Sequence, residues 1–225
     1  MKLLKKHALF NLLFLIISIS CSKKEKDALK HILLHTEKRN SIECNSLIEC
    51  VSAVVNDLQS IFGKETVPDF TSFQDLIDST GAELKKSCSD NLDTPVLIDS
   101  LISIIYEKWA IVFDSDQDNL KSLFPHTVIS HKKGSCLGVS LLFLLFAEKL
   151  NYPLYGILLP GHFFVRYDDG KTYRNIEPNK RGYNHPYEYY RERYGINDNS
   201  WYTMKSLSSK ETAAVLYFNI ANICL

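Results

Sequence analysis

The sequence predicts an α+β domain in which a central helix, with a cysteine at its N-terminus, packs on a small antiparallel sheet next to an N-terminal helical layer. Three observations predict this fold class. The first half of the chain has helical periodicity, residues 137–150 contain an apolar run without a polar face, and residues 154–177 form short β-rich segments between turn signals. With 225 residues and 45% hydrophobic content, the chain can bury the core of one domain.

The N-terminus has the features of an export signal. Lysines precede a mostly apolar stretch at 8–19, which is too short to span a bilayer, and Cys21 follows it. This arrangement resembles a bacterial lipobox, although Ser18 stands where Leu is usual. It implies a lipoprotein signal peptide at 1–20, acylation of Cys21 (palmitate among the expected chains), and anchoring in the cell envelope outside the cytoplasm. The alternative is an ordinary signal peptide with a chance cysteine.

A tether at 21–45 is expected to lead into a single domain at 46–225, whose first part is helical. Apolar residues recur at helical spacing over 46–62, and Gly63 is placed to end that helix. A shorter helix is predicted at 73–84. Thr94-Pro95 is a typical helix start and predicts one buried helix from 96 to about 113. These helices form the N-terminal part, residues 46–113.

The core of the domain is predicted at 114–195. The helix at 137–150 is apolar all round, so it should lie inside the protein. Strands are predicted at 154–159, 162–167 and 171–177, and the Asp169-Gly170 turn makes the last two an antiparallel hairpin.

Two segments complete the predicted domain. Residues 178–194 are aromatic, basic and turn-rich, and predict an ordered loop with a short helix around the site. They are either a substrate rim or a packed flap. Ser208 and Glu211 form a capping box that opens a C-terminal helix at 208–223.

Three residues have the types and positions of a nucleophile, a base and an orienting group. Cys136 lies at a predicted helix N-terminus, where unpaired amides and the helix dipole favour a thiolate. His162 begins a strand and can exchange a proton with that thiol, while Glu177, near the end of the next strand, can hold the other ring nitrogen. Asn175, on the same strand face as Glu177, is the alternative orienter.

The remaining cysteines predict disulfide bonding, and the remaining histidines predict no metal site. With Cys21 acylated and Cys136 free, an even number remains, which predicts at least one disulfide of open connectivity among Cys44, Cys50, Cys88 and Cys224. Some of these are alternatively buried thiols. His126, His131 and His185 have no metal-ligand spacing, so no metal is expected. The formal net charge is zero, which argues against nucleic acid as a partner.

The order of these residues resembles the transglutaminase-like superfamily. Cys136, His162 and Glu177-Pro178 match its Cys, His and Asp-Pro positions, with Glu where Asp is commoner, and LPGHFFVRY and NIEPNKRG are similar to a bacterial branch of largely uncharacterised members. The resemblance covers about residues 100–195. It implies a papain-like fold and a Cys–His–acid site without metal or organic cofactor.

Three functions are compatible with that resemblance. The first is a cysteine hydrolase of the peptidase or amidase type that acts on a peptide or protein substrate through an acyl-enzyme. The second is a transglutaminase-type acyltransferase, and the third is a non-catalytic binding module, because some members of this branch lack the cysteine. The cysteine of this sequence favours the first two.

Overall fold

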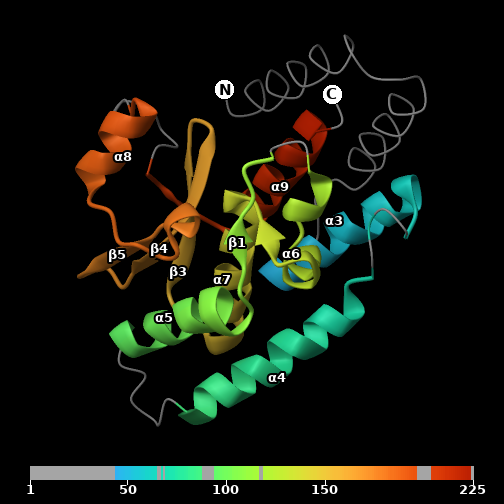
Figure 1. Cartoon of the computed structure of the whole chain (residues 1–225), viewed down its shortest axis with the longest axis horizontal. Coiled ribbons are helices and arrows are strands. Elements are labelled where there is room, and N and C mark those ends of the chain that lie inside the picture. The colour runs from blue at the N-terminus through green and yellow to red at the C-terminus, as the bar shows by residue number, and fades with distance from the viewer. Residues whose placement is uncertain are drawn as a thin grey trace.

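The computed structural model describes residues 44–64, 67, 69–87, 94–116, 119–196 and 204–223. The predicted signal peptide, Cys21, most of the tether, Cys88 and Cys224 lie outside the described residues. Figure 1 shows a sheet with the helix α8 on one side, and α3, α6 and α9 on the other. The protein is thus an α+β molecule with a papain-like arrangement of helices and a small antiparallel sheet, as predicted.

The first two helices follow their predicted positions. Helix α3 spans Leu47–Phe62; the Ser46 side chain accepts a hydrogen bond from the Glu49 amide at its start, and Gly63, with φ of 81°, ends it. Helix α4 spans Thr71–Ser87 and is longer than predicted at both ends. Its polar last turn contains Lys85 and Lys86, which interact favourably with the carbonyl end of the helix dipole.

The predicted single helix at 96–113 was wrong beyond Lys108. Helix α5 spans Thr94–Ser103 and widens into a π-helical turn at Ile104–Lys108, where the Trp109 amide donates to the Ile104 carbonyl at 2.9 Å. Ala110 then has φ of 54°, a left-handed conformation that ends the helix. The chain continues as strand β1, Val112–Phe113, which pairs in parallel with β2, Lys133–Gly134.

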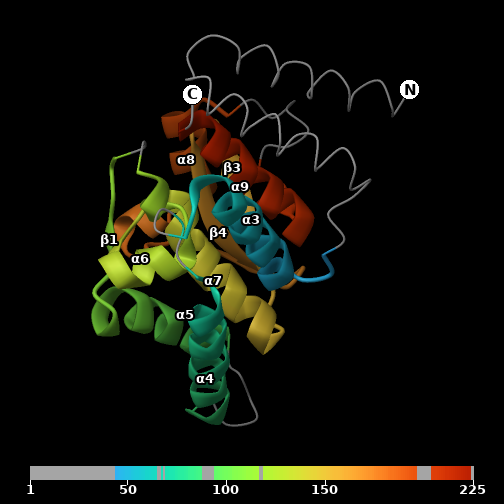
Figure 2. The same ribbon diagram turned by 90° about the vertical axis from the view of Figure 1, so that its right-hand side faces the viewer.

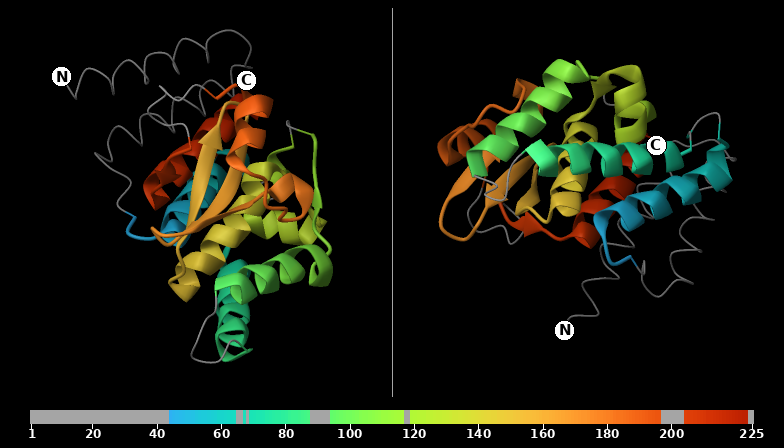
Figure 3. Two further views of the ribbon diagram at one scale, coloured as in Figure 1. Left: turned by 90° about the vertical axis from the view of Figure 1, so that its left-hand side faces the viewer. Right: turned by 90° about the horizontal axis from the view of Figure 1, so that it is seen from below.

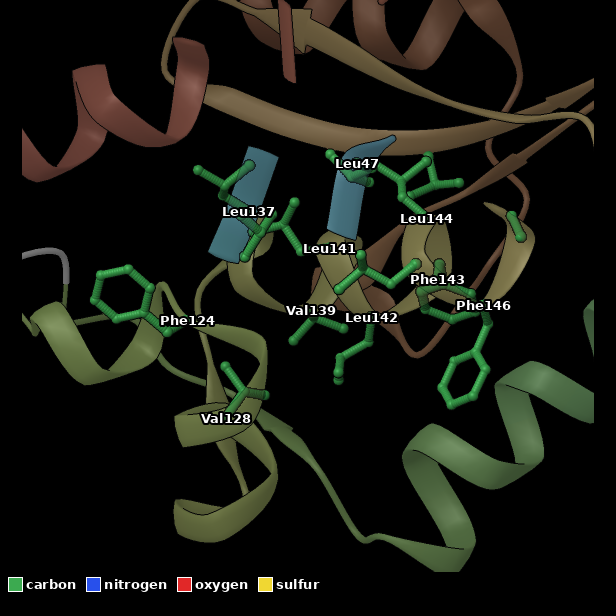
Figure 4. Close-up of a cluster of buried hydrophobic side chains, with 14 of the residues drawn as sticks. Leu47, Phe124, Val128, Leu137, Val139, Leu141, Leu142, Phe143, Leu144 and Phe146 are labelled. Atoms are coloured by element: carbon green, nitrogen blue, oxygen red, sulfur yellow. The ribbon is translucent and has the colours of Figure 1, made fainter. Parts of the chain in front are cut away.

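Helix α7, Cys136–Leu150, is the centre of the molecule. Its buried face extends around the whole circumference, and it contacts α3, α4, α6 (Pro125–His131) and two strands of the sheet. Figure 4 shows leucines and phenylalanines of α7 pointing in several directions from the helix. Seen from below in Figure 3, α4 runs across α7. The prediction that this helix lies inside the protein is confirmed.

The main sheet has the strand order β5-β4-β3-β6, with every pair antiparallel. Its strands are β3 (Leu154–Leu159), β4 (His162–Asp168), β5 (Tyr173–Ile176) and β6 (Ser206–Leu207). On β4, Phe163 and Val165 belong to the core around α7, whereas Phe164 belongs to a smaller cluster with α8. At the predicted hairpin turn, Gly170 has φ of 81° and the Asp169 carboxylate accepts from the Lys171 and Thr172 amides.

Both edges of this sheet are short or covered. On the β5 edge, the Asn175 amide donates to the Asn184 side chain at 3.0 Å, and Glu177 forms a β-bridge with Tyr183. The opposite edge is the two-residue strand β6. The next segment, α9, spans Ser209–Ile223 and runs alongside α3 (Figure 2).

The predicted capping box is confirmed: the Ser208 amide donates to the Glu211 carboxylate at 2.8 Å, and the Glu211 amide donates to the Ser208 hydroxyl at 3.3 Å. Cys44 and Cys50 form a disulfide next to Ala213, and Cys136 is a free thiol. This confirms the predicted disulfide and the free nucleophile candidate. Across the described residues, no helix is both long and apolar enough to cross a membrane.

Candidate active site

Cys136 is held at the first position of α7 by the residues that precede it. The Ser135 hydroxyl accepts from the Gly138 amide at 3.1 Å, and the Ser135 amide and hydroxyl both donate to the Ser122 carbonyl, at 2.9 and 3.1 Å. Gly138 allows this approach, because a Cβ there would lie 2.1 Å from the Ser122 carbonyl oxygen. The half-buried Cys136 sulfur therefore lies at the positive end of a helix whose first turn is fixed on both sides.

His162 lies between Cys136 and Glu177. It begins β4 directly after a turn in which Gly161 has φ of 67°. Its Nε2 is 2.8 Å from Glu177 Oε2, and both side chains are almost completely buried. The Cys136 side chain also acts on this ring, as a hydrogen-bonding group and as a charge, both of which raise the pKa of His162. With Nε2 bonded to Glu177, Nδ1 is the nitrogen left for the sulfur, so the structure brings all three predicted residues together.

The His162 imidazole keeps its proton at neutral pH. Burial lowers its pKa, but hydrogen bonds with Cys136 and Glu177, together with the negative charges of both, outweigh burial and raise the pKa to about 9. A protonated ring between a thiol and a carboxylate favours a thiolate–imidazolium pair. The site therefore has the charge distribution of an activated cysteine.

Glu177 is fixed by the loop that follows it. Its Oε1 accepts from the Asn179 amide at 3.1 Å, and its carbonyl accepts from the Gly182 amide at 2.9 Å. The whole turn is anchored on the π-helical segment, because the Tyr106 hydroxyl donates to the Pro178 carbonyl at 3.0 Å. Sequence analysis missed Tyr106, whose position depends on a helical distortion that the apolar pattern does not reveal.

Asn175, the alternative orienter, does not contact the histidine ring. Its side-chain oxygen accepts from Arg166 Nε at 2.9 Å, and its side-chain nitrogen donates to the His185 carbonyl at 2.8 Å. Asn175 thus ties the β4–β5 hairpin to the loop after Glu177. Glu177 is the group that orients His162 in this structure.

The aromatic segment 178–194 packs against the site, as predicted. Helix α8, Tyr187–Tyr194, places the Tyr194 ring over the His162 ring at 4.7 Å between centroids and an angle of 4°. One turn earlier, Tyr190 stacks on Phe164 at 4.2 Å. The sequence spacing indicates that both stacks can form together, because residues four apart share a helix face and residues two apart share a strand face. The segment is therefore a packed flap over the base, while its outer residues remain exposed.

The other histidines lie elsewhere. His126 packs among Phe70, Phe73 and Phe124, and His131 Nδ1 hydrogen-bonds with the Thr127 carbonyl at 2.9 Å. His185 stacks on Tyr189 beside the Glu177 loop. In the part of the chain that the structure describes, no three His, Cys, Asp or Glu side chains form a group suited to a metal.

Parts of the chain are similar to known proteins. The model of the transglutaminase-like superfamily matches residues 71–197. A UPF0162 protein of Pasteurella multocida (strain Pm70) is 29% identical over 83 residues, which is 36% of this chain and 31% of that protein. The chain thus spans about a third of the length of this relative. No solved structure matches the chain. The family match includes Cys136, His162 and Glu177.

Proposed function

This chain belongs to the transglutaminase-like superfamily, and on that premise we propose that it is a cysteine hydrolase that cleaves peptide or other amide bonds through an acyl-enzyme. The observation that supports this proposal is the buried His162, bonded to Glu177 Oε2 at 2.8 Å, with a pKa raised in part by the half-buried Cys136. A structural cysteine needs neither a helix N-terminus nor a charged imidazole beside it.

The proposed reaction has two steps. The Cys136 thiolate attacks the amide carbonyl carbon, and the amides at the start of α7 stabilise the negative oxygen of the tetrahedral intermediate. Its collapse breaks the C–N bond, and His162 gives its proton to the leaving amine. Neutral His162 then takes a proton from water, which attacks the thioester; the C–S bond breaks and the thiolate is restored beside the imidazolium. The products are a carboxylic acid and an amine.

Acyl trapping tests this function. The protein is incubated with an activated ester of a small carboxylic acid, and the acylated peptide is located by mass spectrometry. We expect one acyl group on Cys136, slow release of the free acid, and no acylation at this position in Cys136→Ala. His162→Ala should slow acylation, and Tyr155→Phe, on the exposed side of β3, should not. If only the unfolded protein is acylated, the proposal of a catalytic site is rejected. The same follows if the acylation rate does not depend on His162.

The same experiment separates hydrolysis from acyl transfer. A primary amine added after acylation resolves the thioester to an amide if an amine acceptor can enter the site, and leaves the acid as product if water is preferred. An amide product as the main species would support the acyltransferase alternative. A protein that binds the ester without acylation would support the binding module.

We also propose that the protein is exported and lipid-anchored at Cys21 in a bacterial envelope. The charged start, the short apolar stretch and the following cysteine support this proposal. The Cys44–Cys50 disulfide adds independent support, because such bonds persist mainly in oxidising compartments. A substrate in the envelope, such as a peptide or protein, follows from that location.

A further inference from the structure

A second feature of the Glu177 loop is a surface pocket of about 440 Å³ lined by Asn179, Lys180, Arg181, Tyr183 and His185. One residue of the pocket wall is hydrogen-bonded to a residue of the candidate site. Asn179 donates its amide to Glu177 Oε1, and Oε2 of the same carboxylate holds His162. Anything bound in this pocket therefore lies on the Glu177 side of the catalytic histidine.

Two basic side chains at this pocket have no acidic partner among the described residues. Among the described residues, no carboxylate lies within ion-pairing distance of Lys180 or Arg181. Arg181 is also fixed: its guanidinium donates to the Tyr106 carbonyl at 3.2 Å and lies 5.5 Å from the centre of the Tyr106 ring. A positioned guanidinium with free donors is suited to a carboxylate.

The wall of the pocket carries polar atoms that lack protein partners. His185 Nε2 and Asn179 Oδ1 are buried without a hydrogen bond to any described residue. His185 is held in place, since its ring stacks on Tyr189 at 3.6 Å and its carbonyl accepts from Asn175. Burial lowers the pKa of His185, and the charges of Lys180 and Arg193 act in the same direction, against the opposing effect of the Glu177 charge. Buried polar groups of this kind usually have a partner.

We propose that this pocket is a subsite for a carboxylate of the substrate, so that the enzyme prefers acidic peptides or amides. The inference rests on the proposed function for the identity of the ligand as substrate. Lys180 and Arg181 supply the charge, His185 Nε2 supplies a buried ring nitrogen available for a hydrogen bond, and the exposed Tyr183 ring supplies a surface for the adjoining peptide chain.

Binding to the Cys136→Ala protein tests the subsite apart from catalysis, so failure of the acylation experiment and failure of this one are distinguishable. The probes are blocked tripeptide amides with Glu, Gln or Lys between two alanines, and a blocked trialanine with a free C-terminal carboxylate. Binding is followed by the NMR signals of His185. We expect the Glu peptide to bind about threefold to tenfold more tightly than the Gln peptide, the difference shrinking with added salt. The trialanine acid shows whether a terminal carboxylate is accepted as well as a side chain.

A matched pair of charge reversals provides the control. Lys180→Glu should abolish the preference for the Glu peptide or invert it toward the Lys peptide. Lys171→Glu makes the same change in net charge at the turn of the β4–β5 hairpin, at the end away from Glu177, and should keep the preference. Equal binding of all peptides, absence of shifts at His185, or the same loss in both variants would overturn the proposal.

Discussion

At the scale of single residues, the chemistry of the site depends on the proton of one buried imidazole. His162 has a carboxylate at Nε2, a thiol at its other side and an aromatic ring over its face. The raised pKa means that the ring stays protonated below about pH 9 and loses its proton as the pH rises through that value. A positively charged imidazolium is therefore expected beside Cys136 across neutral and mildly acidic pH.

The first prediction concerns the reactivity of Cys136. Because the imidazolium stabilises the thiolate, iodoacetamide should alkylate Cys136 rapidly at mildly acidic pH, and His162→Ala should slow this reaction by about tenfold or more. Glu177→Gln should have a smaller effect, and Asn175→Ala should leave the rate close to wild type, since Asn175 contacts Arg166 instead. Peptide mapping separates Cys136 from the other thiols. Amide cleavage, which needs the imidazolium proton, should decline as the pH rises through about 9. An alkylation rate that His162→Ala does not change would contradict the thiolate–imidazolium pair.

The second prediction concerns Tyr194. A ring stacked on an imidazolium stabilises the charged form and excludes water from it. Tyr194→Leu should therefore lower the pKa of His162, measured by NMR of the ring, and slow acylation about threefold to tenfold. Tyr194→Phe keeps the stack and serves as the control. Equal pKa values in the two variants would show that the ring only fills space.

Sequence reasoning identified the three candidate site residues because their types and order restrict the possibilities. It left Glu177 and Asn175 as rival orienting groups, since both lie on one face of the strand predicted at 171–177. The deciding fact is the cross-strand register, which places Asn175 opposite Arg166 and leaves only Glu177 within reach of His162. Register depends on the pairing of whole strands, and residue types alone do not determine it.

At the scale of elements, the start of α7 depends on close contact with the segment at 120–124. A Cβ on Gly138 would lie 2.1 Å from the Ser122 carbonyl oxygen, and backbone cannot move aside without disturbing the bonds of Ser135 to that oxygen. We therefore predict that Gly138→Ala lowers the free energy of unfolding by about 2–4 kcal/mol. The Gly138→Ala substitution should also slow the alkylation of Cys136 by iodoacetamide.

A matched glycine is available as the control. Gly81 lies inside α4, and a Cβ there would meet only the flexible Lys149 side chain, at 3.0 Å. Because Ala is the better helix former, Gly81→Ala should be neutral or stabilise the protein by up to about 1 kcal/mol. Urea unfolding of both variants checks the pair, and equal stabilities would show that the α7 contact is not restrictive.

The disulfide gives a prediction for α3. Cys44–Cys50 closes a short loop around the N-terminus of this helix, where the Glu148 carboxylate of α7 also accepts hydrogen bonds from the Leu47 and Ile48 amides. Replacing both cysteines by alanine should lower the free energy of unfolding by about 2 kcal/mol through greater freedom of the unfolded chain. Non-reducing peptide mapping verifies the pairing. An unchanged stability after replacement would indicate that Glu148 alone holds this end.

Helix positions were largely predictable, whereas the junction between α5 and β1 was not. The apolar residues from Ile104 to Phe113 continue the pattern of a buried helix, so the sequence gives no local reason to stop. The chain leaves the helix because β1 pairs with β2 and Ala110 takes a left-handed conformation, both of which depend on distant contacts. The helices α3 and α7 were predictable because their caps and apolar faces are local features.

At the scale of the whole molecule, the predicted anchor can be tested directly. Membrane-extracted protein should have the mass of a chain that begins at an acylated Cys21, because the signal peptide is removed before that residue. Cys21→Ser should release the protein from the membrane fraction and leave acylation of Cys136 in the folded domain unchanged. An unmodified chain, or one that retains residues 1–20, would reject the anchor.

The covered edges of the sheet have a consequence for how copies of this protein behave beside one another. Unpaired strand edges allow proteins to join edge to edge and aggregate. Here Asn184 and Tyr183 occupy hydrogen-bonding positions along β5, and β6 is only two residues long. Crowding many copies onto one surface should therefore leave them as separate, dispersed molecules.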